Sequence, residues 1–337
     1  MRLLLYIARR LFFLIPILVG ISILTFMMTH LIPGNPVYVI LGPYAKLSDV
    51  EAEIVARGLD QPLHVQYWIY FQDLLRGDLG FGYRTAQPVV DDLIRRFPAT
   101  FELTTVSLIV ALIIAVPLGV QSAIKRGTWF DHVVRAISVG GVAIPIFWSG
   151  FMLIYIFYFK LHIAPPPIGR IAIFVPPPDR ITGLYLVDSL LTANWEALAS
   201  SAQQLVLPVA TLAFAMIAPT VRITRASMLE VMGSNYVRTA VAGGLSRRTV
   251  IYRDTLKNAL LPVVTSIGMQ YGWSLGGEVL VEVAFSWPGM GQFAVSSILA
   301  NDYAPVQGFV LVIALVYVIA NLVVDILYAV IDPRITY

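Results

Sequence analysis

The chain has 337 residues, of which 58% are hydrophobic and only 13% are charged, with 23 Lys and Arg against 20 Asp and Glu. Soluble domains carry about 25% charged residues, so this composition excludes an ordinary soluble domain and indicates an integral membrane protein. The chain has no cysteine and only four scattered histidines, so we expect neither a disulfide nor a metal site.

Six apolar stretches have about the length that an α-helix needs to cross the hydrocarbon core, roughly 20 residues. In chain order they are residues 11–28, 103–124, 136–159, 197–221, 259–277 and 304–324. Arg9 and Arg10 precede the first stretch and no small-residue cleavage site follows it, so we expect an uncleaved anchor. Prolines inside or at the ends of the later stretches predict bent helices packed as a bundle. The sequence therefore predicts an all-α polytopic membrane protein with six transmembrane helices.

The chain is expected to have three parts. Residues 1–29 form a cytoplasmic N-terminus and the first transmembrane helix, and residues 30–100 form an external segment with short helices. Residues 101–337 form a five-helix transmembrane core, which includes an external loop at 160–196 and a cytoplasmic loop at 222–258.

Two short helices are predicted in the segment 30–100. Ser48-Asp49-Val50-Glu51 fits a capping box at the start of the first helix, and Gly58 follows its end. Pro62 opens the second helix, and Gly77 closes it. This segment is either a lid packed on the bundle or a docking surface for an external partner. Three aromatic residues of the second helix are expected near the lipid headgroups: Tyr67, Trp68 and Tyr70.

The second external loop contains two runs of three prolines, which favour extended chain. We expect a loop there, with a short hairpin at residues 170–175.

The distribution of Lys and Arg predicts the orientation of the helices. The loop at 222–258 holds seven basic residues against two acidic ones, and the hairpin after the second stretch carries Lys125, Arg126 and Arg135. The hairpin at 285–303 carries neither Lys nor Arg. We therefore expect the two basic connections in the cytoplasm, the third outside, and both termini in the cytoplasm.

The stretch NYVRTAVAGGLSRRTVIYRDTLKNALLPVV, residues 235–264, belongs mostly to the basic loop. Its beginning combines helical periodicity with small residues at Ala240 and Gly244, which let another surface approach the backbone closely. An orientation signal explains the positive charge but does not explain a short helix with small residues. Such a helix, joined to two spans, suits a mechanical contact with a soluble partner.

This loop resembles the EAA loop of ABC importer permeases. In the dipeptide/oligopeptide/nickel branch the loop reads Y-V-R-T-A-x-A-x-G-L and then N-A-L-L-P, which the chain matches at 236–240 and 258–262. It departs at Gly243, where the branch usually has Lys. Further segments that resemble the branch follow in the same order: 32–36 (I-P-G-N-P, with Asn for Asp), 77–80 (G-D-L-G), 125–131, 285–291 (F-S-W-P-G-M-G) and 302–308.

The resemblance, which runs from about residue 3 to residue 334, implies a type I ABC importer permease in a bacterial plasma (inner) membrane. Its implied partners are a second homologous permease subunit, two cytoplasmic ABC ATPases, an external substrate-binding protein and membrane lipid. The residues expected to couple to the ATPases are Asn235, Tyr236, Arg238, Thr239, Ala240, Gly243, Gly244 and Leu245.

The chain itself is not expected to be an enzyme. It has no G-x-x-x-x-G-K-[ST] motif and no Gly-Lys pair, so a phosphate-binding loop is missing from the sequence. We expect no cofactor in this chain and no nucleic acid partner, with ATP and Mg bound by the partner ATPases.

Residues near the end of the fifth stretch are candidates for the translocation pathway: Gln270, Gly276, Gly277, Glu278 and Glu282. Glu278 is favoured among the carboxylates, because the neighbouring glycines open space and a carboxylate suits the amino terminus of a peptide. Snorkelling or ion pairing at the membrane interface is the alternative for both Glu residues.

Di- or oligopeptides are the expected substrates, and nickel (as a chelate) or glutathione is the alternative within the family. A secondary transporter would leave the EAA-like loop unexplained. An intramembrane hydrolase would need a catalytic constellation inside the spans, and the sequence shows none.

Overall fold

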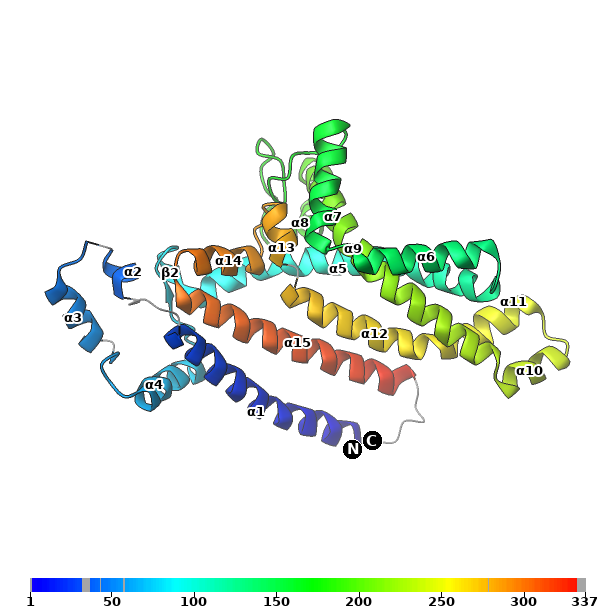
Figure 1. Cartoon of the computed structure of the whole chain (residues 1–337), viewed down its shortest axis with the longest axis horizontal. Helices are drawn as coiled ribbons and strands as arrows, with labels where there is room; N and C mark the ends of the chain where they lie inside the picture. The colour runs from blue at the N-terminus through cyan, green and yellow to red at the C-terminus, as the bar shows by residue number, and fades with distance from the viewer. Residues whose placement is uncertain (1, 32–36, 43, 57, 278, 332–337) are drawn as a thin grey trace. The chain divides into compact units, whose positions relative to one another are not determined.

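Helices form most of this computed structural model, which describes residues 2–31, 37–42, 44–56, 58–277 and 279–331 (Figure 1). The longest of the described helices coincide with predicted apolar stretches, because an apolar chain in a membrane must satisfy its backbone groups internally. These helices are α1 (Arg2–Leu31), α5 (Val89–Ile124), α9 (Trp195–Met232), α12 (Leu256–Gly277) and α15 (Tyr303–Ile331).

Three of the described helices are long and apolar enough to cross a membrane by themselves: Val89–Ile124, Trp195–Met232 and Tyr303–Val323. They correspond to the second, fourth and sixth predicted stretches. α1 contributes a shorter apolar stretch, Ile15–Met27, and α12 covers the fifth predicted stretch. The all-helical fold class is therefore confirmed, whereas the number of six spans stays a prediction.

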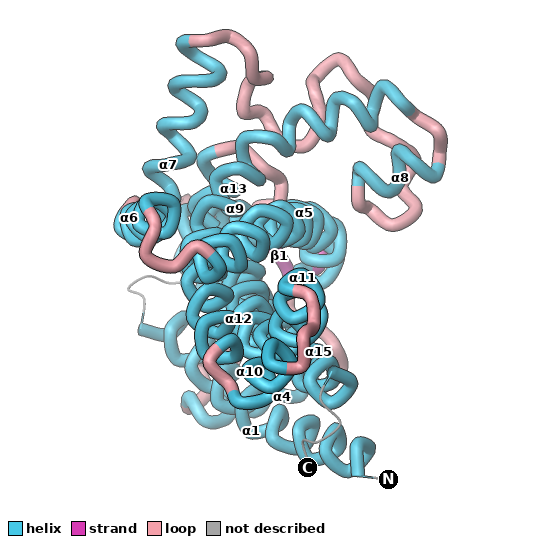
Figure 2. The backbone as a smooth tube through the Cα atoms, turned by 90° about the vertical axis from the view of Figure 1, so that its right-hand side faces the viewer, coloured by secondary structure: helices cyan, strands magenta, loops and turns pink. Residues whose placement is uncertain are grey.

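The third predicted span differs from a single helix. α6 (Trp129–Ala143) is followed by α7 (Ile146–Leu153), which continues as the π-helix η1 (Ile154–Lys160), and the chain bends by 101° between them. Ile144 and Pro145 are extended at this break. Proline disfavours helical conformation in the preceding residue and has no N–H for the helical ladder. Figure 2 shows α7 leading away from α6 into a long loop.

The chain divides into two compact units. The first comprises Met1–Thr100 and Pro288–Val318. It contains α2 (Val37–Leu41), α3 (Leu47–Ala56), α4 (Leu63–Leu75) and α14 (Met290–Leu299). Its core is formed where α5 meets α14, and the buried residues there are Val89, Leu93, Met290 and Phe293.

The two predicted short helices of the first unit are present as α3 and α4, and Gly58 and Gly77 follow them with φ of 66° and 80°. The predicted capping box at Ser48 is wrong. α3 already begins at Leu47, and the Ser48 hydroxyl donates to the Asp49 carboxylate at 3.2 Å instead of capping the helix. An antiparallel hairpin of β1 (Phe81–Gly82) and β2 (Gln87–Pro88), which we did not predict, precedes α5.

Asp302, which directly precedes α15, is buried in the first unit. The backbone N–H of Arg84, in the turn of the β1–β2 hairpin, donates to Asp302 Oδ2 at 3.0 Å, whereas Oδ1 has no hydrogen-bond partner. Burial raises the pKa of the Asp302 carboxyl, and hydrogen bonds from the Arg84 and Tyr83 backbone oppose this shift without cancelling it.

The raised pKa predicts a pH-dependent stability. The folded state binds the Asp302 proton more tightly than the unfolded state, so stability falls as pH rises from the ordinary Asp pKa of about 4 through the raised folded value. Asp302→Asn cannot ionise and should avoid this loss. We expect its thermal unfolding midpoint, relative to the wild type, to increase between about pH 4 and pH 7. A difference that does not change with pH would contradict this assignment.

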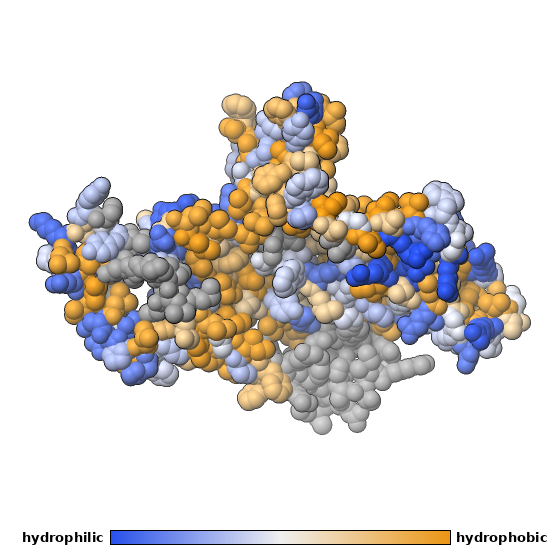
Figure 3. Space-filling view, viewed as in Figure 1, coloured by the Kyte–Doolittle hydropathy of each residue, from blue (hydrophilic) through white to orange (hydrophobic). Residues whose placement is uncertain are grey.

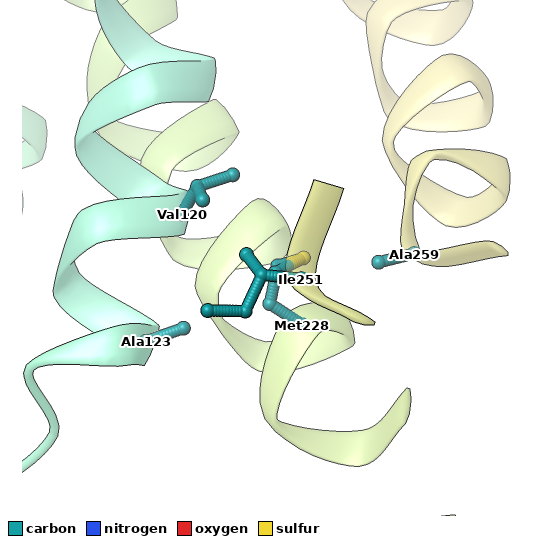
Figure 4. Packing of buried hydrophobic residues seen from close by; sticks show 5 residues of the cluster. All are labelled: Val120, Ala123, Met228, Ile251 and Ala259. Atoms are coloured by element: carbon teal, nitrogen blue, oxygen red, sulfur yellow. The ribbon is translucent and has the colours of Figure 1, made fainter. Parts of the chain in front are cut away.

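The second unit comprises Phe101–Trp287 and Ile319–Thr336. Within it α9 contacts α6, α7, α12 and α8 (Tyr185–Leu191). The loop between η1 and α8 has turns and bends rather than strands, so the hairpin that we predicted at 170–175 is wrong. Four elements meet in one buried cluster (Figure 4): Val120 and Ala123 of α5, Met228 of α9, Ile251 of the π-helix η2 (Val250–Thr255) and Ala259 of α12.

The part of α5 in this unit lies close to α9 at Gly119. A Cβ atom at Gly119 would lie 2.6 Å from Cβ of Thr224 and 3.0 Å from the carbonyl oxygen of Val221. Gly119→Ala must therefore push the two helices apart, and we expect a loss of about 1–3 kcal/mol, typical of overpacking. The thermal unfolding midpoint and the yield of folded protein measure this effect.

Gly140→Ala in α6 is the matched control, because a Cβ there meets nothing within 4 Å. This variant should equal or slightly exceed the wild type in stability, since alanine favours the helix by up to about 1 kcal/mol over glycine. Equal behaviour of the two alanine variants would show that the close approach at Gly119 is absent.

Candidate functional site

The predicted short helix of the basic loop is present as α10 (Asn235–Ala242). It ends in a Schellman motif, in which the N–H of Leu245 donates to the carbonyl of Ala240 at 3.2 Å and that of Gly244 to Val241 at 3.0 Å. Gly244 has φ of 80°, a conformation that costs L-residues energy because of their Cβ. The backbone conformation therefore accounts for glycine at this position without any partner.

One side of α10 is fixed to the elements that follow it. Val237 is buried, and α10 contacts both α9 and η2. The Tyr236 hydroxyl accepts a hydrogen bond from Asn258 Nδ2 at 2.9 Å and donates to the carbonyl of Asp254 at 3.4 Å. Asn258 lies in the first turns of α12, so this contact joins the two halves of the sequence pattern, 236–240 and 258–262.

Sequence reasoning did not assign a role to Val237 or Asn258. A helical wheel would have indicated Val237, since it is an apolar side chain among polar neighbours. Asn258 had no signal of its own beyond its place in the pattern, because its bond to Tyr236 depends on how the chain turns between α10 and α12.

The rest of α10 and its C-terminal turn faces away from the unit. Arg238 and Thr239 are exposed, and Leu245 is half exposed at 50%. Figure 3 shows hydrophilic residues mixed with hydrophobic ones over α10 and α11 (Arg247–Thr249). The structure places the predicted coupling residues on one helix and its C-cap: Asn235, Tyr236, Arg238, Thr239, Ala240, Gly243, Gly244 and Leu245. Their coupling role stays a prediction.

The connection from α10 to α12 is ordered throughout. Ser246 caps α11 by accepting from the N–H of Thr249 at 3.2 Å. The π-helix η2 follows directly, and its residue Ile251 lies in the buried cluster with Met228 and Ala259. The Ser227 hydroxyl donates to the carbonyl of Ala259 at 2.8 Å, which ties α9 to α12 at the same level. These contacts connect α10 through α11 and η2 to the two long helices α9 and α12.

A buried ion pair joins the start of α6 to α9. Asp131 is 1% exposed, and its carboxylate accepts from Arg225 Nε at 2.6 Å and Arg225 Nη2 at 2.8 Å. It also accepts from the hydroxyl of Ser122 at 2.6 Å and the N–H of Gly127 at 3.0 Å. The sequence pattern included Asp131 in a matching segment but gave no partner for it, because Arg225 is 94 residues away.

The candidate pathway residues lie in different helices. Gln270 of α12 is half buried, and its Nε2 is 3.0 Å from the Ser266 hydroxyl and 3.4 Å from that of Thr220 in α9. Gln270 therefore lies where α12 contacts α9. Glu282 is 1% exposed in α13 (Val279–Ala284), which contacts α7 and α9.

The other candidate pathway residues lie at the end of α12 or follow it in the chain. Gly276 is half buried, and Gly277 is the last residue of α12. Glu278 lies outside the described residues. The pathway role of all five residues stays a prediction.

The loop before α9 is held by two carboxylates. Glu102 of α5 accepts from Arg170 Nη2 at 2.6 Å and from the N–H of Leu186 at 2.8 Å. Asp188 of α8 is buried, and burial alone would raise the pKa of its carboxyl. Hydrogen bonds from the Thr182 hydroxyl and from the backbone of Thr182, Gly183 and Ile181 outweigh burial and lower that pKa. The loop is therefore an ordered structure despite its two proline runs.

Two family descriptions match the chain. Residues 115–337 match "Binding-protein-dependent transport system inner membrane component", and residues 3–104 match the N-terminal membrane component of the same transport systems.

Several curated relatives are similar over nearly the whole chain. One is the probable D,D-dipeptide transport system permease protein DdpB of Escherichia coli K12, which is 44% identical, with 96% of this chain and 94% of the relative covered. The dipeptide transport system permease protein DppB of Alkalihalophilus pseudofirmus is 43% identical, with 98% and 99% covered. The glutathione transport system permease protein GsiC of Escherichia coli O6:H1 is 37% identical, with 98% and 99% covered.

A solved structure shares the fold. A chain of the MetNI methionine ABC transporter in inward-facing conformations superposes with a TM-score of 0.51 at 18% identity. The match covers 71% of this chain and 96% of that chain.

Proposed function

Because the chain belongs to the family of binding-protein-dependent transport system inner membrane components, we propose that it forms half of the translocation pathway of an ATP-driven importer for di- or oligopeptides. Relatives named as dipeptide permeases, at 43–44% identity over nearly the full length, support this substrate class. The type I ABC importer permease fold agrees with this role.

In this proposal α10 is the contact for the cytoplasmic ATPases. The observation that carries it is the combination of an exposed face with a rigid attachment, made by buried Val237 and by the Tyr236–Asn258 hydrogen bond. Two partner ATPases bind ATP and Mg, and their closure displaces α10. The attached helices α9 and α12 then move between two arrangements, as a ligand-driven switch with differential binding requires.

The remaining partners are a second homologous permease subunit and an external substrate-binding protein. Both termini and the loop 222–258 lie in the cytoplasm, and the segments 30–100 and 160–196 lie outside. Six transmembrane helices, with α6 and α7 together counting as one broken span, satisfy this orientation, because an even number of spans returns the chain to the cytoplasm.

Glutathione is the second candidate substrate, because a relative that is 37% identical is named as a glutathione permease. Both candidates are short peptides with a free amino group and free carboxylates. Among the proposed pathway residues Gln270, Gly276, Gly277, Glu278 and Glu282, the Gln270 amide suits a substrate carboxylate and the two Glu carboxylates suit an amino group.

Purification of the tagged chain from its native membrane tests the proposal. We expect mass spectrometry to identify two Walker-motif ATPases and a second permease in the same complex. Uptake of labelled dipeptides, glutathione and nickel is then compared in cells with and without the chain. A chain that purifies alone, under conditions that keep a control importer intact, would refute the importer assignment. Loss of glutathione uptake alone would refute the dipeptide assignment.

A further inference from the structure

Helix α4 packs along the side of α1 rather than beyond its end. The Tyr67 hydroxyl lies 2.9 Å from the Ser22 hydroxyl, and the Tyr70 hydroxyl lies 3.5 Å from that of Thr25. The ring of Phe26 packs edge to face on Tyr67 with centroids 5.5 Å apart. All three contacted residues of α1 belong to its apolar stretch Ile15–Met27.

The position of these contacts gives the depth of α4 in a membrane that α1 enters. At a rise of 1.5 Å per residue, Thr25 and Ser22 lie about 5 Å and about 9 Å inside the apolar stretch 11–28, measured from its last residue, Met28. Helices that lie in the plane of a membrane interface are buried about 5–10 Å into the boundary between headgroups and acyl chains. The contacts therefore place α4 at the level of this boundary.

The centres of the two flanks of α4 differ in polarity, whereas exposed Gln72 borders the apolar flank and exposed Ile69 borders the polar one. Trp68 and Leu75 are two turns apart on one flank and are 57% and 74% exposed. Gln66 and Asp73 are also two turns apart, and at 3.6 residues per turn they lie about 160° around the helix from Trp68 and Leu75. The side of α4 that contacts α1 lies between these two flanks. The apolar flank and the polar flank therefore point in opposite directions on either side of that contact.

The aromatic residues of α4 also suit a membrane boundary. Trp68 stacks on Phe71 with ring centroids 6.1 Å apart, and Phe71 stacks on Tyr67 at 5.9 Å. None of the residues of α4 is fully buried, and Trp68, Ile69 and Leu75 are among its exposed residues. Trp and Tyr are enriched where one part of the side chain meets hydrocarbon and another meets water.

We propose that α4 is an interfacial helix that binds the lipid bilayer beside α1, with Trp68 and Leu75 against the acyl chains and Asp73 toward water. The occupant of its apolar flank is lipid, because α4 contacts α1 inside the apolar stretch and not above it. This surface anchor would fix the segment 30–100 relative to the membrane, and it is independent of the substrate that is transported.

The native absence of cysteine allows a direct test in the full transporter. A nitroxide is attached to Trp68→Cys, and in a matched variant to Asp73→Cys, with cysteine-free partner subunits in vesicles of phosphatidylethanolamine and phosphatidylglycerol. Electron paramagnetic resonance then compares relaxation of each label by oxygen, which concentrates in lipid, and by a water-soluble nickel chelate. We expect a several-fold higher ratio of oxygen to nickel relaxation at position 68 than at position 73.

Equal, water-like ratios at both positions would overturn the proposal. So would a label at position 68 that is open to nickel in the vesicle and becomes protected only when the external binding protein is added, because the flank would then dock a protein. Leu75→Cys, on the same flank and more exposed, replaces Trp68→Cys if loss of the indole disturbs folding. It carries the same expected result.

Discussion

Asp131→Ala is expected to destabilise the permease by about 3–5 kcal/mol, the loss typical when one partner of a buried ion pair is removed. Arg225 would keep a largely buried charge without its carboxylate, and the hydroxyl of Ser122 and the N–H of Gly127 would lose their acceptor. Since the pair joins the start of α6 to α9, the loss should appear as a lower thermal unfolding midpoint and a lower yield of the complete transporter.

Two further variants separate the ion pair from a general effect of mutation at this site. Arg135 lies 3.8 Å from Asp131 but is half exposed, so Arg135→Ala should change stability by no more than about 1 kcal/mol. Arg225→Met combined with Asp131→Ala should recover part of the lost stability, because no unpaired charge remains. If the double variant is less stable than Asp131→Ala alone, the unpaired arginine is not the cause.

Gly244→Trp is expected to reduce ligand-stimulated transport at least tenfold (about 1.4 kcal/mol in coupling terms) while the chain still inserts and assembles. A Trp at φ of 80° would strain the Schellman turn by about 1–2 kcal/mol and would add a bulky ring to the exposed end of α10. When both rates are measured in the same proteoliposomes, ATP hydrolysis should continue while uptake falls. The ATPases would keep their own activity but would no longer be coupled to the permease through α10.

Gly77→Trp is the matched control for this prediction. Gly77 also has φ of 80° and a Cβ there would meet nothing within 4 Å, but it follows α4 and lies outside the predicted coupling residues. This variant should transport at close to the wild-type rate. Normal coupling in Gly244→Trp would remove α10 from the proposed mechanism.

The sequence predicted the elements whose signals are local. α10 was expected because apolar and small residues recur at helical spacing, and the ends of α3 and α4 followed from Gly58 and Gly77, which favour positive φ. Long apolar runs predicted α5, α9 and α15, since helices satisfy their own backbone groups in a membrane.

Features that depend on distant contacts were not predictable in this way. The partnership of Asp131 with Arg225, and that of Tyr236 with Asn258, arises only when separate helices pack. Pro145 signalled a bend in the third span, but its size of 101° depends on packing in the second unit.

The π-helix η2 has a consequence for chain length. In a π-helix the N–H groups bond one residue further back than in an α-helix, so the segment accommodates an inserted residue without a loop. Removing one residue from Val250–Thr255 would turn this segment into ordinary α-helix and leave the elements on either side in phase. A deletion in the middle of α12 would instead rotate every following side chain by about 100°. Length variation among related chains should therefore be tolerated at η2, next to the contact surface of α10, and rejected inside the long helices.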